Sequence, residues 1–180
     1  MGLIVTNFDQ RAGNDIFVAN DAGPNHYYQS QDHSNSDTKS HKSFDPTTTR
    51  EIRGKYSLSE EASLRGCAWS AQGKPQACMG IATGDIDRDE KIDLYVTNFI
   101  NEYNTVYLQT QPGLFRDRSR SSGTVEANRD TVGFGCQAAD LDADGFLDLF
   151  VVNGHVDDYR NGSPFQMPSD IWKGSSDGFV

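Results

Sequence analysis

The sequence predicts an all-β chain that contains three copies of one repeat. A short loop rich in carboxylates occurs three times, and each copy is followed by a run of β-branched and aromatic residues that ends in Asn. The clearest copy spans residues 140–153 and reads DLDADGFLDLFVVN. Because such apolar runs between turn residues are typical of strands, each copy is interpreted as strand, loop and strand.

The loop of the third copy has the composition of a calcium site. Four carboxylates stand at positions 1, 3, 5 and 9 of the loop, and they repel one another unless a cation lies among them. Ligands that are all oxygen atoms select a hard ion such as calcium. Position 6 is Gly145, which adopts positive φ without strain, and position 7 would add a backbone carbonyl. We therefore expect calcium ligands at Asp140, Asp142, Asp144, Phe146 and Asp148.

An EF-hand is the alternative for this loop, because it opens with the same Asp-x-Asp-x-Asp-Gly pattern. An EF-hand loop ends in Glu at position 12 and lies between two helices. Here position 12 is Val151, inside the run Leu149 to Val152 that is typical of a strand. The sequence therefore favours a calcium loop between two strands.

The second copy spans residues 85–98 and keeps all four carboxylate positions. Glu90 stands where the third copy has Gly145, and a residue with a Cβ atom costs about 1 kcal/mol or more at positive φ. We therefore expect a weaker or slightly distorted site here. Its expected ligands are Asp85, Asp87, Asp89, Lys91 through its carbonyl, and Asp93.

The first copy spans residues 7–20 and departs further from the pattern. Its candidate ligands are Asn7, Asp9 and Asp15, but position 5 is Arg11. A fixed cation inside the loop can take the place of an ion, so we expect this weak site to be vacant. The sequence as a whole predicts about two calcium ions.

The similarity between the copies extends beyond the loops. Gly2, Gly80 and Gly135 each stand five residues before a loop, and Gly-x-Phe or Gly-Phe follows at residues 113–115 and 178–179. Self-similarity of this kind is typical of a propeller or a solenoid. The position-9 aspartates are 78 and 55 residues apart. The polar stretch 31–50 accounts for most of the difference, and we interpret it as a surface insertion or a disordered loop.

On these residues the chain resembles the FG-GAP, or VCBS, repeat family, whose repeats form the blades of integrin-alpha-type β-propellers. The resemblance covers nearly all of the chain outside the insertion. Three further segments are similar to the bacterial branch that carries a C-terminal ASPIC/UnbV segment, although that segment is not in this sequence. They are residues 73–80, 96–99 and 152–155.

The resemblance implies one partial β-propeller over residues 1–180, with about three four-stranded blades at approximately 1–65, 66–120 and 121–180. A repeat of 55 residues is long enough for four strands. Closed propellers have about four to eight blades, so we expect a fragment of a larger propeller. The alternatives are a fourth blade assembled from the two ends of the chain, and self-association through open sheet edges.

Composition limits the partners and the location. The net charge of −10 argues against nucleic acid as a partner, and no apolar run is long enough for a membrane span. The sequence does not begin with a signal peptide, but Met1 and Gly2 lie inside the repeat pattern, so this says little about the compartment. Weak calcium sites belong outside the cytosol, so we expect an extracellular, periplasmic or cell-surface location.

The remaining reactive side chains do not form a catalytic pattern. Cys67 and Cys78 flank a turn-like stretch and are either a disulfide or, as we favour, small buried thiols. His155 with Asp157 and Asp158 could form a general-base or metal pair, but a structural loop position is the preferred interpretation. No motif for a Ser, Lys or Cys nucleophile is found, so we expect no enzyme activity.

Two classes of function fit this sequence. The first is a calcium-built module that presents loops to an unknown protein or carbohydrate ligand, as in cell adhesion. The second is a catalytic or non-catalytic propeller within a secreted enzyme, because FG-GAP-like propellers also occur in polysaccharide lyases, phospholipases and enediyne-associated proteins. We favour the first class because catalytic residues were not found.

Overall fold

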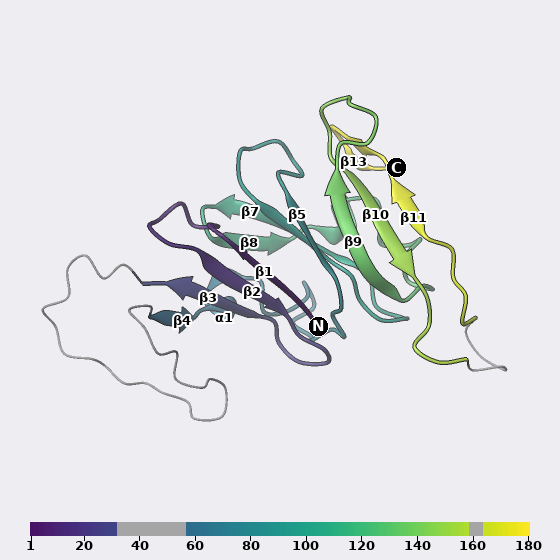
Figure 1. Ribbon diagram of the computed structural model, residues 1–180, viewed down its shortest axis with the longest axis horizontal. Coiled ribbons are helices and arrows are strands. Elements are labelled where there is room, and N and C mark those ends of the chain that lie inside the picture. The colour runs from purple at the N-terminus through teal and green to yellow at the C-terminus, as the bar shows by residue number, and fades with distance from the viewer. Residues whose placement is uncertain (32–56, 159–163) are drawn as a thin grey trace, which may run out of the picture.

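A computed structural model describes residues 1–31, 57–158 and 164–180. Nearly all of the insertion predicted at 31–50 therefore lies outside the described residues. Within them the chain is all-β and forms antiparallel sheets, as the apolar runs predicted. Figure 1 shows these sheets side by side, with the second sheet between the first and the third.

The first and second sheets have four strands each, in chain order. The strands of the first sheet are β1 (Gly2–Thr6), β2 (Asp15–Ala19), β3 (His26–Ser30) and β4 (Leu58–Glu60). Those of the second sheet are β5 (Ile81–Gly84), β6 (Asp93–Val96), β7 (Thr105–Gln111) and β8 (Leu114–Asp117). Two short helices follow β4 and β8, α1 (Ala62–Arg65) and the 3₁₀ helix η1 (Ser119–Ser121).

The third sheet contains a break in its third strand. Its first three strands are β9 (Gly133–Ala139), β10 (Asp148–Asn153) and β11 (Asp170–Trp172). The hairpin of β12 (Gly174–Ser175) and β13 (Gly178–Phe179) follows directly. Lys173, between β11 and β12, exchanges two backbone hydrogen bonds of 2.9 and 3.0 Å with Val180. The hairpin therefore continues the third strand and supplies the fourth, which completes the expected four-stranded repeat.

Strand register supports the alignment of the three repeats. In each sheet the residue after the position-9 Asp pairs with an aromatic residue on the third strand, although the connecting loops differ in length. The three pairs are Ile16 with Tyr28, Leu94 with Tyr107 and Leu149 with Trp172. The three repeats that were aligned by sequence therefore also share one strand register.

Among the described residues, the hydrophobic core consists of two clusters, one on each face of the second sheet. Leu94 and Val96 of β6 pack into the cluster shared with the first sheet, whereas Tyr95 packs into the cluster shared with the third. Successive side chains of a strand point to opposite faces, so a strand between two sheets is apolar at every position. This explains the continuous apolar run in β6, which is buried throughout.

The outer faces of the first and third sheets expose apolar side chains. Phe150 of β10 stands at the repeat position of the buried Tyr95, yet it is 38% exposed. Ile171 is also exposed on this face, as are Leu3 and Val5 on β1. Each outer face is thus built like a face that packs against a neighbouring sheet.

Candidate metal centre

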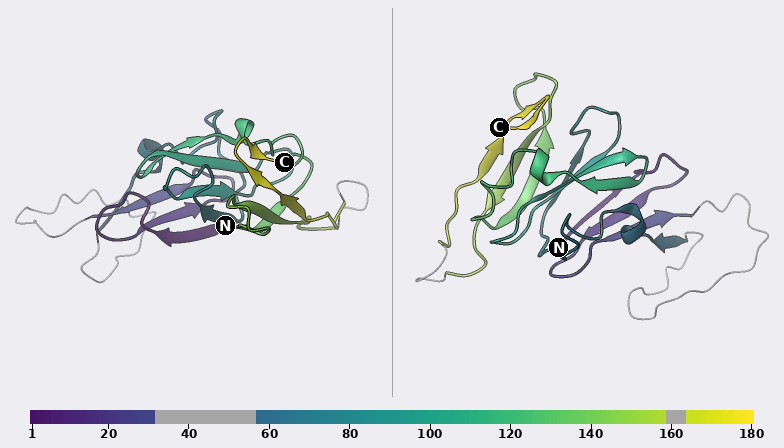
Figure 2. Two further views of the ribbon diagram at one scale, coloured as in Figure 1. Left: turned by 90° about the horizontal axis from the view of Figure 1, so that it is seen from above. Right: turned by 180° about the vertical axis from the view of Figure 1, so that it is seen from behind.

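The three acidic loops lie at the same end of their sheets, between the first and second strands of each (Figure 1). We call residues 7–15 the first loop, 85–93 the second and 140–148 the third. Figure 2 shows the same arrangement from two further directions. Because the three sheets share one topology, the equivalent positions of the loops can be compared directly.

The Asp at position 9 is buried in all three loops and connects the loop to the sheet. One of its carboxylate oxygens accepts a hydrogen bond from the N–H of position 2, and the other accepts one from the third strand or its continuation. The donors are Phe8 (3.2 Å) and Ser30 (3.0 Å) to Asp15, Ile86 and Gln109 (both 2.8 Å) to Asp93, and Leu141 (2.9 Å) and Gly174 (2.8 Å) to Asp148. Position 9 therefore has a structural role that the sequence pattern did not indicate.

The second and third loops share one internal hydrogen-bond pattern. In each, the Asp at position 1 accepts the N–H groups of positions 5 and 6, and the Asp at position 5 accepts the N–H of position 7. The three distances are 2.8, 2.9 and 3.1 Å in the second loop and 3.1, 3.0 and 3.0 Å in the third. The same backbone therefore carries the predicted ligands in both loops.

The backbone is left-handed at two positions of these loops. Position 6 has φ of 66° at Glu90 and 88° at Gly145, so the Cβ atom of Glu90 is placed where a Cβ is costly. Position 4 is left-handed in all three loops, with φ near 60° in each: Gln10 60°, Arg88 63° and Ala143 61°. None of these residue types is a signal for positive φ, so sequence reasoning missed this position.

Three of the four predicted carboxylates in each of the second and third loops gather closely enough to share a cation, whereas Asp93 and Asp144 are outside these groups. One oxygen from each of Asp85, Asp87 and Asp89 lies within 4.8 Å of the others, and the same holds for Asp140, Asp142 and Asp148. Two oxygens about 2.4 Å from one calcium ion are at most about 4.8 Å apart, so these groups fit the ion. In the described part of the chain, the first loop forms no such group.

Burial raises the pKa of two carboxyls in the second loop. The pKa of Asp93 rises to about 7, mainly because the side chain is removed from water, although N–H donors from Gln109 and Ile86 act in the opposite direction. Burial and the neighbouring Asp89 raise the pKa of Asp87. Since each charged form is disfavoured here, a cation among these groups would relieve the cost of ionisation.

A basic side chain lies against the carboxylates of each loop. Lys91 contacts Asp89 in the second loop. Lys173 contacts Asp142 and lies 3.1 Å from Asp144, and these hydrogen bonds raise the pKa of the lysine. Lys173 comes from the third strand, 25 residues after the loop ends, so its contact with the loop could not be predicted from the loop sequence.

The first loop has a different arrangement around its carboxylates. Gln29 donates a hydrogen bond of 2.6 Å to Asp9, and the Arg11 guanidinium lies 3.7 Å from the same carboxylate. The side chain of Asn7 donates to the carbonyl of Arg11, and the second left-handed residue is Gly13, at position 7 rather than 6. Asp9 is therefore held by protein groups, and Asp15 has the position-9 role.

The other candidate groups are separated from the loops. Cys67, Cys78 and Cys136 are free thiols, and burial raises the pKa of Cys78 and Cys136 to about 12. His155 packs edge-on against Phe99 with ring centroids 5.4 Å apart, and its Nδ1 accepts a long contact of 3.4 Å from the N–H of Asp157. Cys67 and Cys78 are therefore buried free thiols, as the sequence favoured, whereas Cys136 is partly buried.

Residues 85–151 match the family model described as an FG-GAP-like repeat. The match begins at the first ligand position of the second loop and ends inside β10, so it contains both acidic clusters. Among curated proteins, none matches the chain. Within residues 1–31, 57–158 and 164–180, no helix has the length and apolar character needed to cross a membrane. Residues 85–151 are thus similar to an FG-GAP-like repeat, and the described chain around them is all-β.

Proposed function

We propose that the chain is part of a calcium-built β-propeller that presents its loops to a protein or carbohydrate partner outside the cytoplasm. The observation that carries the calcium proposal is the pair of oxygen clusters in loops of identical hydrogen bonding. The FG-GAP-like match over both loops supports the propeller. Placement in the ASPIC/UnbV branch rests on the similarity of residues 73–80, 96–99 and 152–155.

Calcium would have a structural role in this proposal. Asp85, Asp87, Asp89 and Asp93 would hold one ion together with the carbonyl of Lys91. Asp140, Asp142, Asp144 and Asp148 would hold the other together with the carbonyl of Phe146. When bound, the ion neutralises the loop carboxylates and so removes their mutual repulsion. Because the chain supplies most of the ligands to each ion, little coordination remains for a substrate.

The exposed apolar faces support the larger assembly. Phe150 and Ile171 on the third sheet are placed where the second sheet has the buried Tyr95 and Val106. Leu3 and Val5 are exposed on the outer face of the first sheet. We propose that further blades, or a second copy of the chain, cover these faces. An extracellular, periplasmic or cell-surface location follows from the calcium concentration that loops of this kind require.

The variant Asp144→Ala tests the calcium proposal. Asp144 is exposed, and its contacts with Lys173 and with the N–H of Phe146 are both at the surface, so its removal costs little without an ion. We expect the melting temperature to fall by several degrees in calcium and by about 1 °C or less in EDTA. Equal losses under both conditions would show that Asp144 acts through turn geometry alone. Asp177→Ala, an exposed Asp on the β12–β13 turn, is the matched control.

A further inference from the structure

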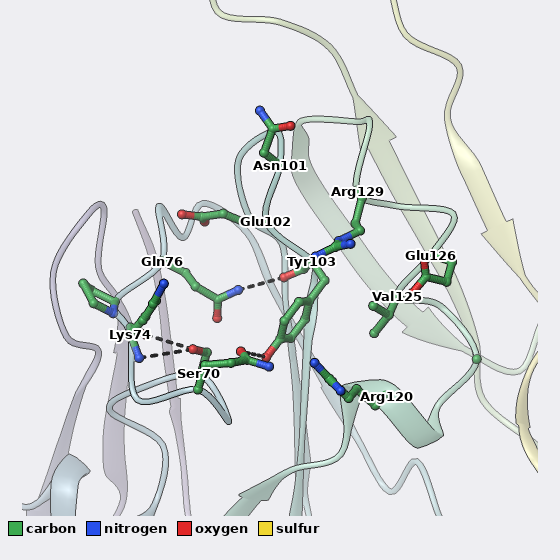
Figure 3. Close-up of a pocket in the computed structure, with 13 residues that line it drawn as sticks. Ser70, Lys74, Gln76, Asn101, Glu102, Tyr103, Arg120, Val125, Glu126 and Arg129 are labelled. Atoms are coloured by element: carbon green, nitrogen blue, oxygen red, sulfur yellow. Dashed lines mark hydrogen bonds between the residues drawn. The ribbon is translucent and has the colours of Figure 1, made fainter.

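A cavity of about 640 Å³ opens at the end of the sheets opposite the acidic loops. Figure 3 shows the side chains that line it. Three segments line it: the connection from α1 to β5, the loop from β6 to β7, and the chain from η1 to the start of β9. Successive loops of an antiparallel sheet lie at alternate ends, which places this cavity away from the candidate calcium ions. Its volume lies in the range of small-molecule sites, about 300 to 1,000 Å³.

The floor of the cavity is a hydrogen-bonded network built on the buried side chains of Gln76, Tyr103 and Thr105. The Gln76 amide donates a hydrogen bond of 2.9 Å to the Tyr103 carbonyl and accepts one of 2.8 Å from Thr105. The phenol of Tyr103 contacts Gln72 at 2.6 Å and Asp117 at 3.0 Å. These contacts hold the floor in place before any ligand arrives, which lowers the entropy cost of binding.

Three cationic side chains line the cavity above this floor. Lys74 and Arg120 lie on opposite sides of Tyr103, and Arg129 enters from the third segment (Figure 3). Within the described residues, none of the three side chains forms an ion pair or a side-chain hydrogen bond between its charged end and a carboxylate. The carboxylates that line the cavity are those of Glu102 and Glu126.

The charge of the cavity is opposite to that of the chain. Its lining carries three cationic and two acidic side chains, whereas the whole chain has a net charge of −10. The carboxylate of Glu102 already accepts a hydrogen bond of 2.8 Å from the N–H of Ala77. Cations that form no ion pair with the described residues are therefore available to an anionic ligand, and a guanidinium can bind a carboxylate through two parallel hydrogen bonds.

We propose that this cavity binds an acidic carbohydrate, with the carboxylate of a uronic acid unit between Arg120 and Arg129. The proposal rests on the recognition role proposed above and assigns that role a site and a ligand class. The side-chain amides of Gln72 and Asn101 also line the cavity and provide partners for sugar hydroxyls. The lining has few apolar side chains, whereas the centre of a protein-binding surface is rich in aromatic and apolar residues.

The test uses a hyaluronan tetrasaccharide as the probe and neutral chitotetraose as its uncharged counterpart. Both are titrated into the calcium-loaded chain and followed by calorimetry. We expect the acidic sugar alone to bind, and Arg120→Gln or Arg129→Gln to weaken binding about tenfold each, because a charge-assisted hydrogen bond is lost. Arg116→Gln, the same change on an exposed face of β8 outside the cavity, should leave the affinity unchanged.

Several outcomes would overturn the proposal. In two of them, the acidic sugar fails to bind or the neutral sugar binds equally well. The third such outcome is that Arg116→Gln weakens binding as much as Arg120→Gln or Arg129→Gln. Binding of an acidic heptapeptide in place of the sugar would assign the cavity to a protein ligand instead. Thermal melts of the same samples with calcium and with EDTA test the calcium proposal separately from the sugar-binding proposal. If calcium still stabilises the chain while the sugar does not bind, this inference alone fails.

Discussion

At the scale of single residues, the aspartates at position 9 combine two tasks. Asp93 and Asp148 stand among the predicted calcium ligands, but each also accepts two backbone N–H groups that join its loop to the third strand. Asp15 has the same backbone partners in the loop that we expect to be vacant. In the first loop, Asp15 therefore has the structural role of position 9 without the expected role in calcium binding.

The variant Asp15→Asn isolates the structural task. Asn presents one acceptor oxygen and one NH₂ group, so one buried donor among Phe8, Ser30 and the Tyr27 hydroxyl loses its partner. We expect a loss of about 1 to 3 kcal/mol in the free energy of unfolding, measured by urea denaturation. The loss should be equal in calcium and in EDTA. A loss confined to calcium would mean that the first loop binds an ion.

Lys173 is expected to weaken calcium binding at the third loop. Its ammonium lies on the carboxylates of Asp142 and Asp144, so it competes with an ion for the third loop. Repulsion between this charge and a calcium ion about 6 Å away is about 1.4 kcal/mol in water. We expect Lys173→Gln to tighten calcium binding at the third loop about threefold to tenfold, as measured by calorimetry.

Lys74→Gln is the control for this prediction, because Lys74 carries the same charge at the opposite end of the sheets. Its calcium affinity should stay within about twofold of the unchanged chain, since salt screens charges that are far apart. Unchanged or weaker calcium binding in Lys173→Gln would mean that the lysine leaves the loop without cost or helps to shape it.

At the scale of elements, the unit of this chain is a strand, a loop with two left-handed residues, and a second strand. Carboxylate spacing and apolar runs were enough to predict this unit, because both depend on residues close in sequence. The left-handed residues at position 4 could not be predicted, since Gln10, Arg88 and Ala143 share no feature that favours positive φ. The loop as a whole imposes that conformation on them.

Position 6 allows a direct test of the loop backbone. Gly145 has φ of 88° and open space where a Cβ atom would lie, so Gly145→Ala changes only the conformational energy. We expect a loss of about 1 kcal/mol in the free energy of unfolding, from urea denaturation in EDTA. Glu90→Ala should change it by less than about 0.5 kcal/mol, because Glu90 already has a Cβ atom at positive φ.

The comparison of Gly145→Ala with Glu90→Ala tests whether the second and third loops have the same backbone conformation at position 6. If Gly145→Ala were as neutral as Glu90→Ala, the third loop would be free to take a different backbone from the second. The equal hydrogen bonding of the two loops argues against this, because the N–H of position 6 donates to the Asp at position 1 in both.

At the scale of the whole molecule, three sheets of one topology pack in a row and leave two apolar faces exposed. The repeat, the all-β fold and the four-stranded unit could be predicted, because the pattern recurs three times along the chain. The contact of Lys173 with the third loop and the cavity around Tyr103 could not be predicted from the sequence. Lys173 approaches the third loop from another strand, and the cavity joins three segments that are far apart in sequence.

The central claim is that calcium ions hold the second and third loops in place. Calcium titration of EDTA-stripped protein by calorimetry, with a thermal melt at each point, tests it most directly. We expect two binding sites and a large rise in melting temperature as they fill, because a ligand that binds only the folded state stabilises it. No heat of binding, or binding without a rise in melting temperature, would show that calcium does not hold these loops in place.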